Sequence, residues 1–388
     1  MKTIAVIFGG RSAEHDVSIV TAISSIIKPL ELTRQYRVEP VYIAKDGSWY
    51  WDQQLKDIAI YQSGEIDTFR QHAPKVHLLF DNGLTLVKSS QFAGRKKYQK
   101  IDVVFPATHG THGEDGELMG ILEMANVAYV GCGVAASAVS MDKVLAKQVT
   151  QAQGISSTPW TWFYTSDLAV RHSEIIKEIN KLEYPLYVKP AHLGSSIGIT
   201  RVSDPEQLNN ALEVAAHFDN KVIVEQGVNN LVEVTLPIMG NNELTPAYLE
   251  QPMVAAEDFF DFEAKYMGQG KNGGKKSGAK HGAQGYSKIP ADLPEALYKQ
   301  AVEVGLATYR AIGCEGIARV DMLIDSKTKK VFFNEVNPLP GSLYAHNWRA
   351  KGIANIELVT ELVRLAEERY QRQSKLETVF STNFLRQF

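Results

Sequence analysis

The chain has 388 residues, of which 44% are hydrophobic and 22% are charged, a balance typical of a globular protein with two or three domains. Its 41 basic and 44 acidic residues leave a net charge of −3, which excludes a general attraction to nucleic acid or to an anionic membrane. Two cysteines are too few for a disulfide framework and indicate a reducing cytoplasm. The sequence has no signal-like run and no stretch of ~18 consecutive apolar residues, which excludes secreted and membrane-embedded proteins.

The first third of the chain alternates apolar strands with helices. We predict strands at Thr3–Phe8, Val38–Ala44, Val103–Pro106 and Ala128–Gly131, with helices from about Asp16 and over Gly116–Ala125. This order predicts a parallel sheet covered on both faces. Ligands of such sheets bind beyond the carboxyl ends of the strands. The loops Gly9–Glu14 and His109–Gly116 are therefore expected beside a ligand.

Two further units follow, the second beginning near Met141 and the third near Leu231. In the second we predict strands Leu186–Lys189, Ile197–Val202 and Val222–Gln226, with helices near His172–Leu182 and Pro205–His217. In the third we predict strands Leu231–Met239, Gly316–Ile324 and Val331–Val336, with helices Leu293–Ile312 and Ile356–Gln373. The last dozen residues show no readable pattern.

A long polar segment interrupts the third unit. The segment from Tyr266 through Lys288 contains seven glycines and five lysines and no acidic residue, a composition that forms no core. A solvated insertion is one interpretation. The other, which we favour, is a lid over the active site whose cations meet phosphate, because long loops in compact enzymes commonly serve as lids.

Four polar residues are predicted on two neighbouring strands near the end of the chain. Arg319 and Asp321 share one face of their strand, and Glu335 and Asn337 share one face of the next, because strand side chains alternate. Carboxylate and amide oxygens are the ligands with which proteins hold the Mg²⁺ of a nucleotide, and Arg319 offers a planar fork to phosphate. A salt-bridged strand pair is the alternative, but a metal site better explains polar groups on otherwise apolar strands.

Two other segments suit a nucleotide. Lys189 ends an apolar strand and is followed by the Gly194-Ser195-Ser196 turn, a pattern that resembles a phosphate-binding hairpin. Neither a Walker loop nor a dinucleotide-binding glycine fingerprint is present. The strand ending in Glu225 and Gln226, with Glu233 shortly after, suits a nucleoside slot, although an ordinary strand ending in a polar turn is an equal alternative.

The two glycine-rich loops of the first unit carry titratable side chains. His109 and His112 lack a third ligand at fixed spacing, so we reject structural zinc and favour substrate contact. Glu14 and Asp16 could cap a helix, but the position of Glu14 at the same sheet edge makes it a candidate for binding a substrate ammonium group.

Read together, these segments resemble the D-alanine–D-alanine ligase family of the ATP-grasp superfamily over about residues 1–370. The motifs that carry the resemblance are Phe8-Gly9-Gly10-Arg11-Ser12-Ala13-Glu14, His109-Gly110 with Gly113-Glu114-Asp115-Gly116, Gly131-Cys132-Gly133, Ser140-Met141-Asp142-Lys143, Lys189-Pro190 with Gly194-Ser195-Ser196, Asp261-Phe262-Glu263-Ala264-Lys265-Tyr266, Arg319-Val320-Asp321, Asn334-Glu335-Val336-Asn337 and Pro340-Gly341.

The resemblance implies an α/β ATP-grasp fold of three α/β domains, the first Rossmann-like (preATP-grasp). We expect the N-terminal domain at 1–139, the central domain at 140–228, and the C-terminal domain at 229–375 with a mobile lid loop at 257–290, followed by a tail at 376–388. The resemblance also implies a cytoplasmic homodimer, with ATP and D-alanine as small-molecule partners.

The resemblance further implies a role for each site residue. ATP would be held by Lys143, Lys189, Glu225, Gln226, Val228, Glu233 and Lys265, and two Mg²⁺ ions, replaceable by Mn²⁺, by Asp321, Glu335 and Asn337. Glu14 would bind the ammonium of the first amino acid and His109 its carboxylate. Glu14, Ser195 and Tyr266 would form a hydrogen-bonded triad that shuts the lid, and Arg319 with the N–H of Gly341 would stabilise the tetrahedral oxyanion.

Three departures from the family pattern bear on the reaction. The glycine- and lysine-rich run replaces a shorter stretch after Tyr266, and Asn230-Leu231-Val232 lacks an arginine often found before the ribose-binding residue. The family typically has a serine near His346 that binds the second substrate's carboxylate, and this chain lacks it. We assign that contact to Ser342 and His346, with Tyr344 as an alternative. D-alanine is the expected acceptor, with D-serine, D-lactate or another amine as alternatives, and a catalytically idle nucleotide-binding protein as the remaining one.

Overall fold

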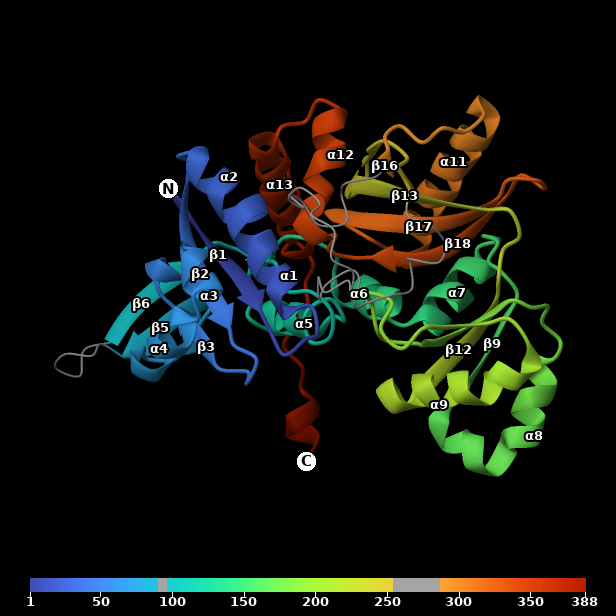
Figure 1. Cartoon of the computed structure of the whole chain (residues 1–388). Helices are drawn as coiled ribbons and strands as arrows, with labels where there is room; N and C mark the ends of the chain where they lie inside the picture. The colour runs from blue at the N-terminus through green and yellow to red at the C-terminus, as the bar shows by residue number, and fades with distance from the viewer. Residues whose placement is uncertain (90–95, 254–286) are drawn as a thin grey trace.

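The fold was obtained as a computed structural model, which describes residues 1–89, 96–253 and 287–388. Its sheets follow one another along the chain, and the last helices return to the first sheet (Figure 1). Lys265, Tyr266 and most of the predicted lid at 257–290 lie outside the described residues. Within the described part, no helix combines the length and apolar character needed to cross a membrane.

The first sheet has the strand order β3-β2-β1-β7-β8. Strands β1 (Lys2–Gly9), β2 (Tyr36–Ile43), β7 (Val103–Pro106) and β8 (Ala128–Tyr129) run parallel, as predicted. Strand β3 (Trp49–Trp51) adds an antiparallel edge that the sequence analysis did not predict.

Helices cover both faces of this sheet, as the apolar strands required. One face packs against α1 (His15–Val20), η1 (Thr21–Ile27) and α2 (Lys28–Leu32), and against α13 (Asn355–Gln373) from the far end of the chain. The other face packs against α5 (Glu117–Met124) and a small antiparallel sheet of β4 (Val76–Phe80), β5 (Leu84–Ser89) and β6 (Lys96–Ile101), which was not predicted.

The second sheet is antiparallel in the order β11-β10-β12-β9. It contains β9 (Trp160–Tyr164), β10 (Leu186–Pro190), β11 (Thr200–Val202) and β12 (Lys221–Gln226), with helices α8 (Leu168–Ile179) and α9 (Leu208–Phe218) packed on its core. Strand β9 was not predicted. Helices α6 (Val134–Met141) and α7 (Lys143–Ala152) lead into this sheet from the first unit.

The third sheet is antiparallel in the order β14-β13-β17-β18. Strands β13 (Leu231–Gly240), β17 (Ile317–Asp325) and β18 (Lys330–Asn337) lie close to the predicted bounds. Strand β14 (Leu244–Pro246) was not predicted. The helix α11 (Glu295–Ile312) packs on it, and the short strands β15 (Gln251–Pro252) and β16 (Ser287–Lys288) pair beside it.

The end of the chain divides into a packed helix and an exposed tail. The apolar side chains of α13 complete the core of the first sheet, so the C-terminal segment ties the third unit to the first. Residues 375–388 beyond it are exposed and contain only the short helix η7 (Phe384–Gln387), in agreement with their unreadable sequence pattern. The domain boundaries at 139, 228 and 375 remain predictions.

Candidate functional site

Two loops of the first unit and a turn of the second meet at Glu14. The hydroxyl of Ser195 donates a hydrogen bond to the Glu14 carboxylate, although the two residues are 181 positions apart. Gly110 lies against the same carboxylate, because a Cβ built on it would come within 2.9 Å of Oε2 of Glu14 and 2.5 Å of the Ser12 hydroxyl. The predicted proximity of the loops after β1 and β7 is thus confirmed.

His109 lies in a buried network behind this carboxylate. Its Nε2 is 3.0 Å from the Thr21 hydroxyl, and its Nδ1 is 3.8 Å from the Glu114 carboxylate. The Thr21 hydroxyl also accepts a hydrogen bond from the backbone N–H of Ser342. One buried hydroxyl therefore connects two residues that we predicted to bind substrate, His109 from the first unit and Ser342 from the third.

The ionisation of these groups reflects their burial and their neighbours. Burial raises the pKa of Glu14, and the charge of Glu114 acts in the same direction. Burial alone would lower the pKa of His109, but its interaction with the nearby Glu114 carboxylate raises it above the ordinary value. Two carboxylates close together favour a bound cation. The site therefore suits a ligand carrying an ammonium group.

The four polar residues on β17 and β18 come together as the strand pattern predicted. Asp321 pairs directly with Glu335 in the register of the two strands, and Arg319 pairs with Asn337. Arg319 binds Asp321 through two hydrogen bonds, 2.7 Å from Nε and 2.5 Å from Nη2, and the Asn337 amide donates a third at 3.0 Å.

On these two strands the cluster has two carboxylates and one cation, Arg319. Burial raises the pKa of Asp321, and the Glu335 carboxylate adds to the effect even though Arg319 opposes it. Two carboxylates and an amide oxygen that are close together and partly uncompensated are a donor set that fits a divalent cation such as Mg²⁺. Lys143, at the start of α7, is 3.9 Å from Glu335 and connects the cluster to the second unit.

Buried lysines and a carboxylate lie beside that cluster on the central sheet. Nζ of Lys189, on β10, is 2.9 Å from Oε2 of Glu225, on β12, and Nζ of Lys147, on α7, is 3.5 Å from Oε1 of the same residue. Lys143 donates to the carbonyl of Leu193 in the Gly-Ser turn. These cations converge on the place where the sequence analysis predicted phosphate.

The remaining predicted nucleotide residues are distributed around this group. Glu233, on β13, acts electrostatically on Lys189, and its charge raises the pKa of that lysine. Gln226 accepts a hydrogen bond from the backbone N–H of Glu183 at the edge of β12, and Val228 follows it in a partly exposed turn. Lys265 and Tyr266 lie outside the described residues, so their predicted roles stay predictions.

The stretch predicted to hold the second substrate is conformationally unusual. Ser342, Leu343 and Tyr344 all have positive φ angles, between 51° and 54°, in the left-handed region that non-glycine residues rarely adopt. The Arg319 guanidinium lies 5.0 Å from the centre of the Tyr344 ring, and the centre of the His346 ring lies 4.7 Å from it. Tyr344 therefore contacts both residues.

His346 forms an ion pair that the sequence did not reveal. Its Nε2 is 2.9 Å from Oε2 of Glu250, which also accepts a hydrogen bond from the Asn347 amide at 3.0 Å. Burial would raise the pKa of Glu250, but the hydrogen bond and charge of His346 lower it below its usual range. His346 is thus held in a fixed orientation by a buried carboxylate.

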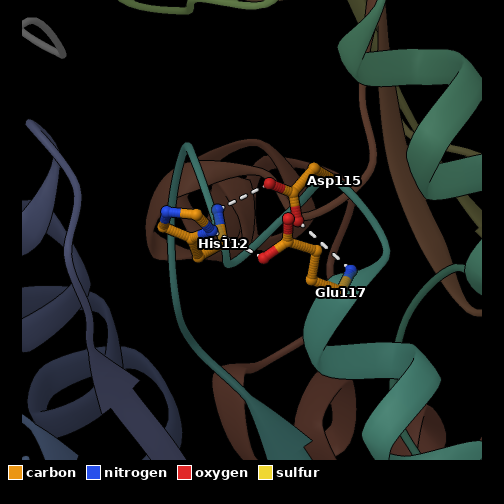
Figure 2. A group of neighbouring side chains, drawn as sticks. All are labelled: His112, Asp115 and Glu117. Atoms are coloured by element: carbon orange, nitrogen blue, oxygen red, sulfur yellow. Dashed lines mark hydrogen bonds and ion pairs between the residues drawn. The ribbon is translucent and has the colours of Figure 1, made fainter. Parts of the chain in front are cut away.

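His112 connects its own loop to the loop after β1, because its Nε2 is 3.4 Å from Nη2 of Arg11. Figure 2 shows it beside Asp115 and Glu117, with its Nδ1 2.6 Å from the Glu117 carboxylate. Asp115 accepts hydrogen bonds from the backbone N–H groups of His112 and Glu117, at the start of α5. Although these side chains could reach one ion, their polar atoms already bond to one another, and the cluster fixes the loop that carries His109.

Four residues of the site were missed by the sequence analysis: Thr21, Lys147, Glu250 and Asn347. The position of Lys147, one helical turn after Lys143, is the only signal that could have identified one of them. The other three belong to a helix, a loop and another helix whose proximity arises from tertiary packing.

Comparison with known proteins places the whole chain beside one group. The family pattern described as D-ala D-ala ligase N-terminus matches residues 3–132, and the pattern described as D-ala D-ala ligase C-terminus matches residues 149–364. A D-alanine–D-alanine ligase from Acetivibrio thermocellus is 37% identical over 390 residues, covering 96% of this chain and 98% of the relative. One from Macrococcus caseolyticus is 36% identical and covers 96% and 97%.

Solved structures give the same comparison. The VanG D-Ala:D-Ser ligase from Enterococcus faecalis superposes with a TM-score of 0.77 at 30% identity, covering 94% of this chain and 99% of that one. The D-alanine–D-alanine ligase from Coxiella burnetii superposes with a TM-score of 0.75 at 26% identity, covering 97% and 98%.

Proposed function

The chain belongs to the D-alanine–D-alanine ligase family, and we propose that it joins two D-alanine molecules into D-alanyl-D-alanine with the hydrolysis of ATP, for peptidoglycan precursor synthesis. The observation that carries the proposal is the hydrogen bond from Ser195 to Glu14. It brings the candidate amino-acid site of the first unit against the phosphate-binding turn of the second.

The first D-alanine would lie between Glu14 and His109. Its ammonium group meets the Glu14 carboxylate, where Glu114 adds negative potential. Its carboxylate meets His109, whose raised pKa favours the imidazolium that such a contact needs. Between these two anchors the substrate carboxylate is directed toward the lysines of the central sheet.

ATP would lie across the second and third units. Lys143 and Lys189 contact its phosphates, Glu225, Gln226 and Val228 its adenine, and Glu233 its ribose. Asp321, Glu335 and Asn337 would hold two Mg²⁺ ions, or Mn²⁺ in their place, which supply positive charge to the phosphate oxygens. Lys265 and Tyr266 complete the predicted nucleotide site and lid.

The reaction proceeds in two steps, because a carboxylate is a poor electrophile. Lys189 balances the charge of the γ-phosphoryl group as it moves to the first D-alanine, giving an acyl phosphate. The amine of the second D-alanine then attacks the acyl carbon, and phosphate leaves. Arg319 and the N–H of Gly341 stabilise the oxyanion of the tetrahedral intermediate, and the lid that includes Tyr266 excludes water.

The second D-alanine would bind through its carboxylate to His346 and Ser342. His346 is oriented by Glu250, and the Tyr344 ring contacts both His346 and Arg319. A cytoplasmic homodimer is the form in which we expect the enzyme to work.

Mass spectrometry of products tests the proposal. The protein is incubated with MgATP and an equimolar mixture of D-alanine, D-serine and D-lactate, and we expect D-alanyl-D-alanine as the main product. A dominant mixed product would assign another acceptor to the Ser342–His346 stretch. Bound ATP with no product would favour an idle nucleotide-binding protein.

A further inference from the structure

Glu225 is a buried carboxylate with a separate cation on each oxygen. Lys189 lies 2.9 Å from Oε2 and Lys147 lies 3.5 Å from Oε1. All three side chains are buried: Lys189 is 11% exposed, Lys147 0% and Glu225 3%. Among the described residues, neither Nζ of Lys147 nor Oε1 of Glu225 has a hydrogen-bond partner, so their ion pair is the main compensation for burying both.

Two lysines share this one carboxylate, and the charge of Glu335 also acts on both of them. Burial lowers the pKa of Lys147, Glu225 opposes that effect, and the charge of Lys189 adds to it. The two lysines lower the pKa of Glu225 to about 2 against the effect of burial. In the protein without nucleotide, Glu225 is therefore paired with both cations.

We propose that nucleotide binding exchanges the partners of Glu225, with Lys147 as its permanent counter-cation. Lys189 leaves Oε2 and moves to the phosphates of ATP. Oε2 is then free to accept a hydrogen bond from the amino group of adenine, while Lys147 stays on Oε1. Lys147 is a positioning residue, since it acts on the nucleotide through Glu225. This inference rests on the proposed assignment of Lys189 to phosphate and Glu225 to adenine.

The charge balance explains why a second lysine is needed. Without Lys147, the protein free of nucleotide would still hold a balanced pair of Glu225 and Lys189. The nucleotide-bound protein would hold a buried carboxylate with no cation, which is strongly unfavourable. Removing Lys147 should therefore weaken nucleotide binding without destabilising the empty protein. If Lys147 served only packing, its removal would destabilise the empty protein and leave nucleotide binding unchanged.

The first test replaces Lys147 with methionine, which has similar volume and no charge. Thermal unfolding is measured with and without Mg²⁺ and the non-hydrolysable analogue AMP-PNP, and the Kd of the analogue is measured by calorimetry. We expect Lys147→Met to unfold at or above the wild-type midpoint without nucleotide. We expect its Kd for the analogue to rise by at least about 100-fold, as for an uncompensated buried charge.

A second variant separates charge from packing. In Lys147→Met/Glu225→Gln the neutral amide needs no cation, and its oxygen can still accept from adenine. We expect the double variant to bind the analogue within about threefold of Glu225→Gln alone, a non-additive result for two residues in contact. Additive losses would overturn the exchange.

Lys221 provides a matched control on the same strand as Glu225. It is also buried and forms an ion pair with Asp142 at 2.7 Å. The other cation beside Asp142, His192 at 3.3 Å, is shared with Asp219, so Asp142 depends on Lys221. Lys221→Met should lower the midpoint without nucleotide and leave the midpoint increase caused by the analogue unchanged.

The inference fails if Lys147→Met behaves as Lys221→Met does, with a lower midpoint and a Kd within about threefold of wild type. Because these measurements follow binding alone, they are separate from the proposed ligation. A wild-type protein that forms no dipeptide but shows the Lys147 effect would overturn the ligation and support the exchange.

Discussion

The ionisation of Glu225 predicts how the stability of this protein depends on acid. Its carboxyl has a pKa lowered from 4.5 to about 2 by the charges of Lys147 and Lys189, which outweigh burial. At about 1.36 kcal/mol per pH unit, this difference contributes about 3 kcal/mol to the free energy of unfolding at neutral pH. Because the folded pKa is the lower one, the contribution is complete above about pH 4.5 and is lost as the pH falls toward 2.

Glu225→Gln isolates this contribution from those of other acids. We measure the free energy of urea-induced unfolding of both proteins by circular dichroism from pH 7 to pH 2.5. Wild type should be more stable than the variant by about 3 kcal/mol at pH 7 and by about 2 kcal/mol at pH 3.5, and the gap should approach zero near pH 2. A gap that stays constant across this range would refute the assignment of the stabilisation to an ionised Glu225.

Three further predictions concern the other parts of the site. Glu335→Ala should reduce turnover by at least about 100-fold because it removes a metal ligand. It should change the free energy of unfolding by less than about 1 kcal/mol, since the attraction of Glu335 to Lys143 is offset by its repulsion from Asp321. Near-normal steady-state turnover would contradict the metal site. His346→Ala should raise the KM of the second D-alanine by about 10- to 100-fold with the KM of ATP unchanged, because a charge-assisted hydrogen bond is lost; equal changes in both constants would contradict the assignment. Gly110→Ala should destabilise the protein by about 1–3 kcal/mol and weaken the binding of the first D-alanine, because φ of Gly110 is +69° and the added methyl group would meet Ser12 and Glu14. Wild-type stability in a thermal unfolding assay would contradict this prediction.

The alternation of apolar strands and helices was enough to predict the first sheet. Apolar runs such as Thr3–Phe8 can be buried on both faces only in a covered parallel sheet, so their pattern and their spacing specify the topology. The polar pairs on β17 and β18 were predictable for a related reason. Strand alternation placed Arg319 with Asp321 and Glu335 with Asn337, and the two strands follow each other along the chain.

Short or amphipathic strands escaped prediction. The segments β4, β5 and β6 carry lysines and polar residues among their apolar ones, so their pattern is typical of a loop as much as of a strand. Their pairing with one another and their packing on the first sheet stabilise them as strands. Strand β9 was missed because its aromatic run lacks the alternation that identifies a half-buried strand.

The sequence by itself determined the fold class, the covered parallel sheet, the family resemblance and the residues that meet at the carboxyl ends of the first sheet. These depend on local patterns, which a chain carries in the order of its residues. Only the tertiary structure decided that Thr21 joins His109 to Ser342, that Glu250 orients His346 and that Lys147 shares Glu225 with Lys189. Each of these contacts joins residues far apart in the chain, and the packing of separate elements brings their side chains within reach.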